Sequence, residues 1–175
     1  KPGRLIIGDY YYQCYITGSK KSSYLKSRRR METKLTITSD LPYWVREDLH
    51  SFRKNGATDQ GLDYPYDYLF DFTSNFRSDA LVNTGFTASN FRMIIYGPCS
   101  NPAVHISGHT YVVNGEVGEG EYITIDSVAK TVTRTAVDGT ITNLFNLRGR
   151  ESYIFEKIQS GKCTIVWDGD FGIDI

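Results

Sequence analysis

A chain of 175 residues has room for one domain, or for one domain and part of a second. Its 20 basic and 20 acidic side chains give a formal net charge of zero, so no global field draws it to nucleic acid or to an anionic membrane. No apolar run approaches the roughly 20 residues of a membrane-spanning helix, and the first residues lack a signal-peptide layout, so no membrane insertion is expected.

Residues 1–50 contain two or three predicted strands. In METKLTIT (31–38), Met31, Leu35 and Ile37 fall on one face of an extended chain and alternate with polar residues. So few strands cannot close a core, so we expect them to complete a domain whose other strands lie elsewhere. The missing initiator methionine and the strand-like final FGIDI lead us to expect a piece of a longer protein.

A basic segment, KKSSYLKSRRR (20–30), interrupts this first region. We interpret it as a solvated hairpin rim or a subunit contact, and phosphate binding is the less favoured alternative because no nucleic-acid module surrounds it. The candidate subunit-contact residues are Lys20, Lys21, Lys26, Arg28, Arg29 and Arg30.

The next segment carries aromatic residues and then a polar linker. YWVREDLHSFRK (43–54) fits either a short helix or an extended connector, and residues 51–63 are interpreted as a linker because they become polar and rich in turn formers. In DYPYDYLFDF (63–72), every second residue is aromatic. This stripe suits either the core, which we favour, or a platform for sugar or protein.

From residue 64 onward, short alternating runs separated by turn dipeptides predict an all-β, antiparallel sandwich or barrel, nearly without helix. The expected strands are 91–96, 110–113, 121–126, 130–135, 152–158 and 163–167, and the turns between them include Asn114-Gly115, Asp138-Gly139 and Ser160-Gly161. Cys14, Cys99 and Cys163 have no CxxC spacing, so we expect reduced thiols packed in strands.

Two histidines four residues apart, His105 and His109, raise the question of a metal site. Ser107-Gly108 predicts a two-residue hairpin turn that pairs His105 with Thr110 and Ile106 with His109. The imidazoles would then lie on opposite faces of the ribbon, so no metal site is expected there.

The sequence predicts no enzyme. Glu116, Glu119, Glu121 and Asp126 could supply a pair of carboxylates for glycoside hydrolysis, but the first three belong to a glycine-rich turn where charge is expected anyway. Nucleophile elbows, P-loops and dinucleotide glycine patterns do not occur. We therefore expect no catalytic residues, no metal and no cofactor.

An ordered set of motifs resembles the C-terminal domain of distal tail proteins from phages with long, non-contractile tails. The set consists of YPYDYLFDF, LVNTGFTASNFRMIIYGPCSNPAVHISGHTYVVN, GEYITIDSVAKTV and NLFNLRGRESYIFEKIQSGKCTIVWDGDFGIDI, and together it covers residues 64–175. Residues 1–50 are more loosely similar to the closing strands of the N-terminal belt domain of that family.

The resemblance implies a galectin-like or jelly-roll β-sandwich (64–175), preceded by a few strands of an incomplete, β-barrel-like belt domain (1–50). It also implies a virion protein of the phage tail tip, assembled in the host cytoplasm. There it would form a homo-oligomer, a hexameric ring when the belt domain is complete, as the baseplate hub between the tail tube protein and the tail-associated fiber or lysin.

A second interpretation is a carbohydrate-binding module for adhesion to the host surface. Exposed aromatic side chains on such a sandwich can stack on sugars, and the candidates are Tyr96 and Trp167. The position of Trp167 on one strand face with Ile165 favours the core instead, and a buried indole would count against this interpretation.

Overall fold

A computed structural model describes residues 3–25, 30–54 and 77–175. The chain divides into two compact units, Lys1–Asp48 and Leu49–Ile175. The aromatic segment 63–72 and most of the expected linker lie outside the described residues. Whether the first unit is the end of a belt domain stays a prediction.

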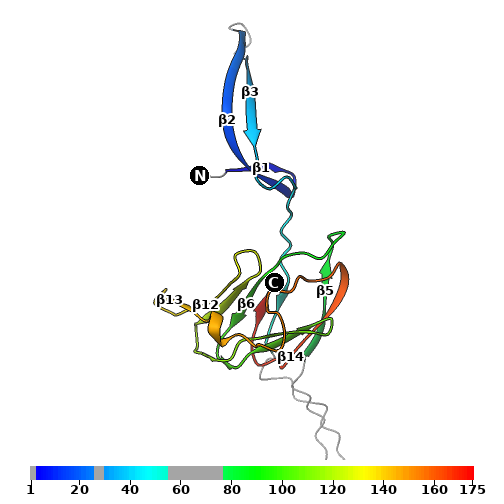
Figure 1. Cartoon of the computed structure of the whole chain (residues 1–175), viewed down its shortest axis with the longest axis vertical. Coiled ribbons are helices and arrows are strands. Elements are labelled where there is room, and N and C mark those ends of the chain that lie inside the picture. The colour runs from blue at the N-terminus through cyan, green and yellow to red at the C-terminus, as the bar shows by residue number, and fades with distance from the viewer. Residues whose placement is uncertain (1–2, 26–29, 55–76) are drawn as a thin grey trace, which may run out of the picture. The chain divides into compact units, whose positions relative to one another are not determined.

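The first unit is a three-stranded antiparallel sheet (Figure 1). β1 (Gly3–Ile7) pairs with the first five residues of β2 (Tyr10–Leu25), and the rest of β2 pairs with β3 (Arg30–Thr38). β3 confirms the strand predicted from METKLTIT. Because β1 is short, β2 and β3 form a two-stranded ribbon over most of their length.

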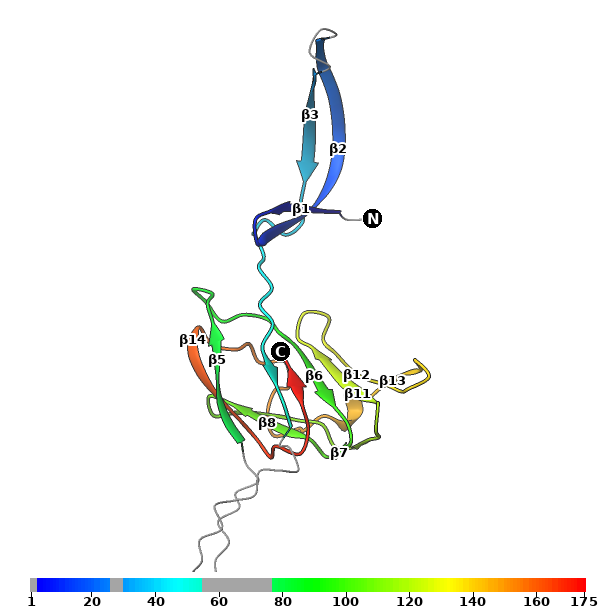
Figure 2. The ribbon, with the colours of Figure 1, turned by 180° about the vertical axis from the view of Figure 1, so that it is seen from behind.

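The second unit is an antiparallel sandwich of two main sheets (Figure 2). The six-stranded sheet runs in the order β13 (Ile141–Asn143), β12 (Thr131–Thr135), β11 (Tyr122–Asp126), β6 (Arg92–Tyr96), β15 (Ile173–Asp174) and β4 (Ser51–Phe52). The four-stranded sheet runs in the order β5 (Arg77–Asn83), β14 (Gly161–Trp167), β8 (Ala103–Ile106) and β9 (His109–Val112). β7 (Cys99–Ser100) pairs with β10 (Glu116–Val117), and the one helical turn of the described residues is the 3₁₀ segment η2 (Phe145–Leu147).

The inner faces of the two sheets share one hydrophobic core. Phe52 packs edge-on against Trp167 at 5.7 Å between ring centroids, and Phe91 does the same against Tyr111 at 5.2 Å. The fully buried aliphatic residues come from alternate positions of the strands, among them Met93, Ile95, Val104, Ile123, Ile125, Ile165 and Ile173. These cross-sheet contacts confirm the predicted all-β antiparallel sandwich.

Three local expectations are resolved by the structure. Residues 43–50 are extended, with Val45 bridging to Tyr11, so the connector alternative holds and the helix does not form. Ser51 and Phe52, placed in the linker by sequence, form β4 because the Phe52 ring reaches the core beside Trp167. The strand predicted at 152–158 is wrong. The segment consists of bends and turns with one bridge at Ile158, and its consecutive residues Ile154 and Phe155 are both buried, unlike the alternate burial of a strand with one face on the core.

The cysteines match their prediction. Cys14, Cys99 and Cys163 are free thiols in β2, β7 and β14. Cys14 and Cys163 are buried, and Cys99 is half-buried.

Candidate interaction surfaces

The clearest feature of the first unit is an uncovered apolar surface. Strand register puts nine side chains on one face of the sheet, which we call the apolar face: Leu5, Ile7, Tyr10, Tyr12, Cys14, Ile16, Met31, Leu35 and Ile37. Ile16 is 66% exposed and Leu35 is 53% exposed. The Trp44 ring lies 5.3 Å from the Tyr12 ring and covers one end of the apolar face. Among the described residues of this unit, Cys14 is the one hydrophobic residue that is buried. Contiguous exposed apolar patches of this kind mark interaction surfaces.

On the opposite face of the sheet, side chains form polar contacts with one another. The Tyr11 hydroxyl donates a hydrogen bond to Glu47 Oε1 at 2.8 Å, and the Arg4 guanidinium lies 4.1 Å from the centre of the Tyr11 ring. Burial, followed by the hydrogen bond to Glu47, raises the pKa of Tyr11. Ile6 is the exposed aliphatic side chain beside this group, at 68% exposure. The two faces therefore differ in chemistry, and the apolar face is the better candidate for protein contact.

The predicted basic contact lies near the far end of the β2–β3 hairpin. Lys20 and Lys21 are exposed on β2, and Arg30 begins β3. Lys26, Arg28 and Arg29 lie outside the described residues. The subunit-contact role of all six residues stays a prediction.

The two candidate sugar contacts differ in accessibility. Trp167 is fully buried, and its indole N–H donates to the Phe171 carbonyl at 3.1 Å, so it offers no ring face to a sugar. The prediction of Trp167 as a sugar contact is therefore wrong, because its position in the core beside Ile165 leaves the indole no outward face. Tyr96 is 40% exposed, and its hydroxyl donates to Asp174 at 2.7 Å. That hydrogen bond, followed by burial, raises the pKa of Tyr96.

The histidine hairpin has the predicted register. His105 pairs with Thr110 and Ile106 pairs with His109, so the imidazoles lie on opposite faces. His105 Nδ1 is 2.9 Å from Thr110 Oγ1, and His109 Nε2 is 2.9 Å from the Tyr153 carbonyl. Among the described residues, no group of three or more His, Cys, Asp or Glu side chains is arranged to hold a metal ion.

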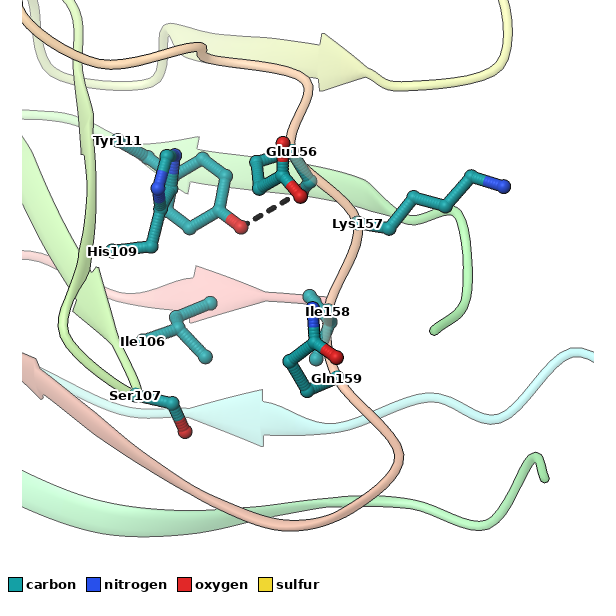
Figure 3. Close-up of a pocket in the computed structure, with 8 residues that line it drawn as sticks. All are labelled: Ile106, Ser107, His109, Tyr111, Glu156, Lys157, Ile158 and Gln159. Atoms are coloured by element: carbon teal, nitrogen blue, oxygen red, sulfur yellow. Dashed lines mark hydrogen bonds between the residues drawn. The ribbon is translucent and has the colours of Figure 1, made fainter. Parts of the chain in front are cut away.

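A pocket of about 290 Å³ lies beside this hairpin (Figure 3). It is enclosed by the hairpin end, Ile106 to Tyr111, and by residues 156–159. The Tyr111 hydroxyl donates a hydrogen bond to the Glu156 main-chain carbonyl at 2.8 Å. Burial, with a smaller effect of the Glu156 charge, raises the pKa of Tyr111. Glu156 is the one carboxylate of the lining, so the pocket lacks the carboxylate pair used in glycoside hydrolysis.

Two of the four carboxylates considered for catalysis, Glu121 and Asp126, have structural partners. Glu121 accepts a hydrogen bond from the Gly118 N–H at 2.9 Å. Asp126 accepts from the N–H groups of Val128 and Ala129 and pairs with Arg92 at 3.2 Å. Glu116 and Glu119 are exposed. Two of the four carboxylates thus hold turns together.

None of the helical segments that the structure describes has the length and apolarity needed to cross a membrane.

Comparisons with known proteins give a similarity in structure. No family model and no curated protein matches the chain. A chain in the structure of the phage p2 baseplate in its activated conformation with Sr is 17% identical, with a TM-score of 0.49 over 95% of this chain and 64% of that one. The same baseplate with Ca gives 16% identity and a TM-score of 0.47, over 94% and 64% of the two chains. This chain therefore spans less than two thirds of the length of the baseplate chains that it resembles.

Proposed function

We propose that the chain is a structural subunit of a bacteriophage tail tip, the distal tail or baseplate hub protein. In this role it forms a homo-oligomer, a hexameric ring when the belt domain is complete. The ring joins the tail tube protein to the tail-associated fiber or lysin and to the receptor-binding apparatus. The motif set of residues 64–175 supports this proposal, and so does a sandwich that follows a small sheet suited to assembly. No reaction is part of the proposal.

The apolar face of the first unit carries the proposal. Ile7, Ile16 and Leu35 are each more than half exposed on it, and solvation of so many apolar groups on so small a sheet is unfavourable. Other strands or subunits that cover this face would remove that cost. Stable interfaces bury about 800 Å² per partner around apolar centres, and a row of aliphatic and aromatic side chains suits such a centre.

Solution mass tests the proposal. Analytical ultracentrifugation of a protein that carries a complete belt domain should give a ring of about six subunits. Ile16→Lys with Leu35→Lys should reduce the ring to smaller species, because both charges fall on the apolar face. Thr36→Lys, on the opposite face of β3, is the matched control and should leave the ring intact. A protein that stays monomeric, or a ring that the apolar-face variants leave intact, would count against the proposal.

A carbohydrate-binding module remains the second candidate, and of its two predicted contact residues only Tyr96 is accessible. A glycan array with the chain and its Tyr96→Ala variant separates the two functions. Sugar binding that disappears in the variant favours the module, whereas an array without signal favours a purely structural role.

A further inference from the structure

A second surface of the sandwich combines aromatic rings with cations. Phe145 stacks on Phe155 at 6.1 Å between ring centroids, and Tyr153 meets Phe155 edge-on at 5.8 Å. The Arg148 guanidinium lies 3.9 Å from the centre of the Phe145 ring, and Lys130 Nζ lies 5.4 Å from that of Tyr153. Phe155 is buried, whereas Tyr153 is 55% exposed. The buried Phe155 ring therefore supports the outer Tyr153 ring, and one cation lies over Tyr153 and another over Phe145.

Seven consecutive residues, 148–154, line an open groove of about 440 Å³ beside Tyr153, which we call the arginine groove. Its backbone is fixed to the sandwich. The Gly149 N–H donates to the Val112 carbonyl at 2.8 Å, Ser152 Oγ donates to the Thr110 carbonyl, and His109 Nε2 holds the Tyr153 carbonyl. A Cβ on Gly149 would lie 3.1 Å from the Val112 Cβ, so glycine permits this close approach. A groove fixed in this way binds a ligand with little loss of loop entropy.

Two of the seven lining residues are arginines, Arg148 and Arg150. Arg148 is oriented by its stacking on Phe145 and by a hydrogen bond from its Nη1 to the Phe145 carbonyl at 2.6 Å. Arg150 is exposed and forms no hydrogen bond or ion pair with any residue that the structure describes. Glu151 is the one acid of the lining. Planar guanidinium groups bind carboxylates and phosphates through paired hydrogen bonds, so the groove favours an anionic group.

We propose that the arginine groove binds an acidic saccharide. The apolar face of the sugar ring packs on Tyr153, and its carboxylate or phosphate pairs with Arg150, supported by Arg148. An acidic peptide fits less well. Peptides commonly add to an open strand edge, and here Arg148 already bridges to Val113 and the Gly149 N–H is already bonded. This site goes beyond the tail role and does not depend on ring formation.

Titration of the 175-residue chain, followed by NMR of its backbone amides, tests the site. The probes are glucuronic acid, glucose 1-phosphate, neutral glucose and a hexaglutamate peptide. Either acidic sugar should shift the resonances of residues 148–154, and glucose should bind at least about tenfold more weakly, which is about 1.4 kcal/mol. Comparison of the two acidic sugars shows which anionic group is preferred. Binding should also weaken as salt is raised, because the charges are exposed.

Variants separate a binding role from a structural one. Arg150→Gln should weaken binding of the acidic sugar about tenfold, and Tyr153→Ala should weaken binding of every sugar, whereas Tyr153→Phe should retain it. Lys162→Gln is the control, because Lys162 is also an exposed cation of this unit but lies on β14, outside the groove lining. Since Arg150 is exposed and forms no hydrogen bond or ion pair with the described residues, the spectrum of its variant should otherwise stay unchanged. Three results would overturn the proposal: equal affinity for glucose and the acidic sugars, no binding at about 20 mM, or tighter binding of hexaglutamate.

Discussion

Asp126 shows how one carboxylate organises a turn. It ends β11, and its Oδ1 accepts hydrogen bonds from Val128 N–H at 2.9 Å and Ala129 N–H at 2.8 Å, while its Oδ2 pairs with Arg92. Burial alone would raise the pKa of Asp126, but the two N–H groups and the Arg92 guanidinium outweigh burial and lower it. The charged form therefore stabilises the folded protein.

This lowered pKa predicts a pH-dependent contribution to stability. The contribution is complete at pH values above the unfolded pKa of about 4, and it is lost as the pH falls through the lower folded pKa. Urea unfolding should show that Asp126→Asn, which keeps the acceptor and removes the charge, loses less stability between pH 7 and pH 3 than the parent chain. Asp126→Ala should cost about 1–2 kcal/mol at pH 7. Glu119→Gln, in an exposed loop, is the control, and an equal pH response in Asp126→Asn would contradict the assignment.

Cys99 is the thiol of intermediate exposure, yet it should react slowly. Burial, with a smaller effect of the Asp168 charge, raises the pKa of Cys99 to about 11, so the thiolate is scarce at neutral pH. Titration with Ellman's reagent at pH 7.5 should therefore show slow labelling of the folded chain and rapid labelling of all three cysteines in urea. If one thiol reacts rapidly without denaturant and Cys99→Ser abolishes that reaction, the raised pKa of Cys99 would be contradicted.

At the scale of elements, the sequence predicts hairpins better than irregular segments. Ser107-Gly108 defines the β8–β9 register, since a two-residue turn leaves one pairing of the flanking residues. Residues 152–158 are rich in apolar side chains, as strands are, but the segment is held by hydrogen bonds from Tyr111 and Ser89 in other parts of the sandwich. β4 has only two residues, too few for a periodic signal, and it forms because Phe52 meets a distant Trp167.

The sequence predicts the candidate surfaces only in part, as it does the elements. Alternation identifies the apolar side of β3, but whether that side is covered depends on neighbouring strands that a local pattern does not describe. The arginine groove carries no sequence motif. Its residues adjoin one another in the chain, yet the Tyr153 ring depends on support from Phe155 and on the contact between its carbonyl and His109.

The turn of the β8–β9 hairpin offers a test at the same scale. Ser107 and Gly108 have φ values of 47° and 84°, in the left-handed region. Gly108→Ala should lower the free energy of unfolding by about 1 kcal/mol through backbone strain alone, since no atom lies within 4 Å of the added Cβ. Ser107→Asn should be neutral or stabilising, because asparagine tolerates this region. In thermal denaturation, the control Gly115→Ala should have little effect, because its added Cβ makes an ordinary contact with Leu147 at 3.6 Å.

For the molecule as a whole, burial divides unequally between the two units. The second unit buries side chains from both of its main sheets in one cluster. In the described part of the first unit, Cys14 is the one hydrophobic residue that is buried. Beyond Cys14, β2 and β3 form a ribbon of two strands, and such ribbons are marginally stable in water without further cover. If the chain assembles as proposed, we therefore expect the first unit to gain more stability from a covering partner than the second does.

Hydrogen exchange should make this difference measurable. In the isolated chain, the amides of β2 and β3 should exchange through local opening, well before those of β6, β11 and β14, which lie within the sandwich. Inside a ring with the apolar face covered, β2 and β3 should gain protection, whereas the strands of the sandwich should change little. Ile95→Ala serves as the control, because it should destabilise the second unit by about 2–5 kcal/mol and leave exchange in β2 and β3 unchanged. Equal protection of both units in the isolated chain would show that the apolar face needs no partner, and the proposed route of assembly would then be wrong.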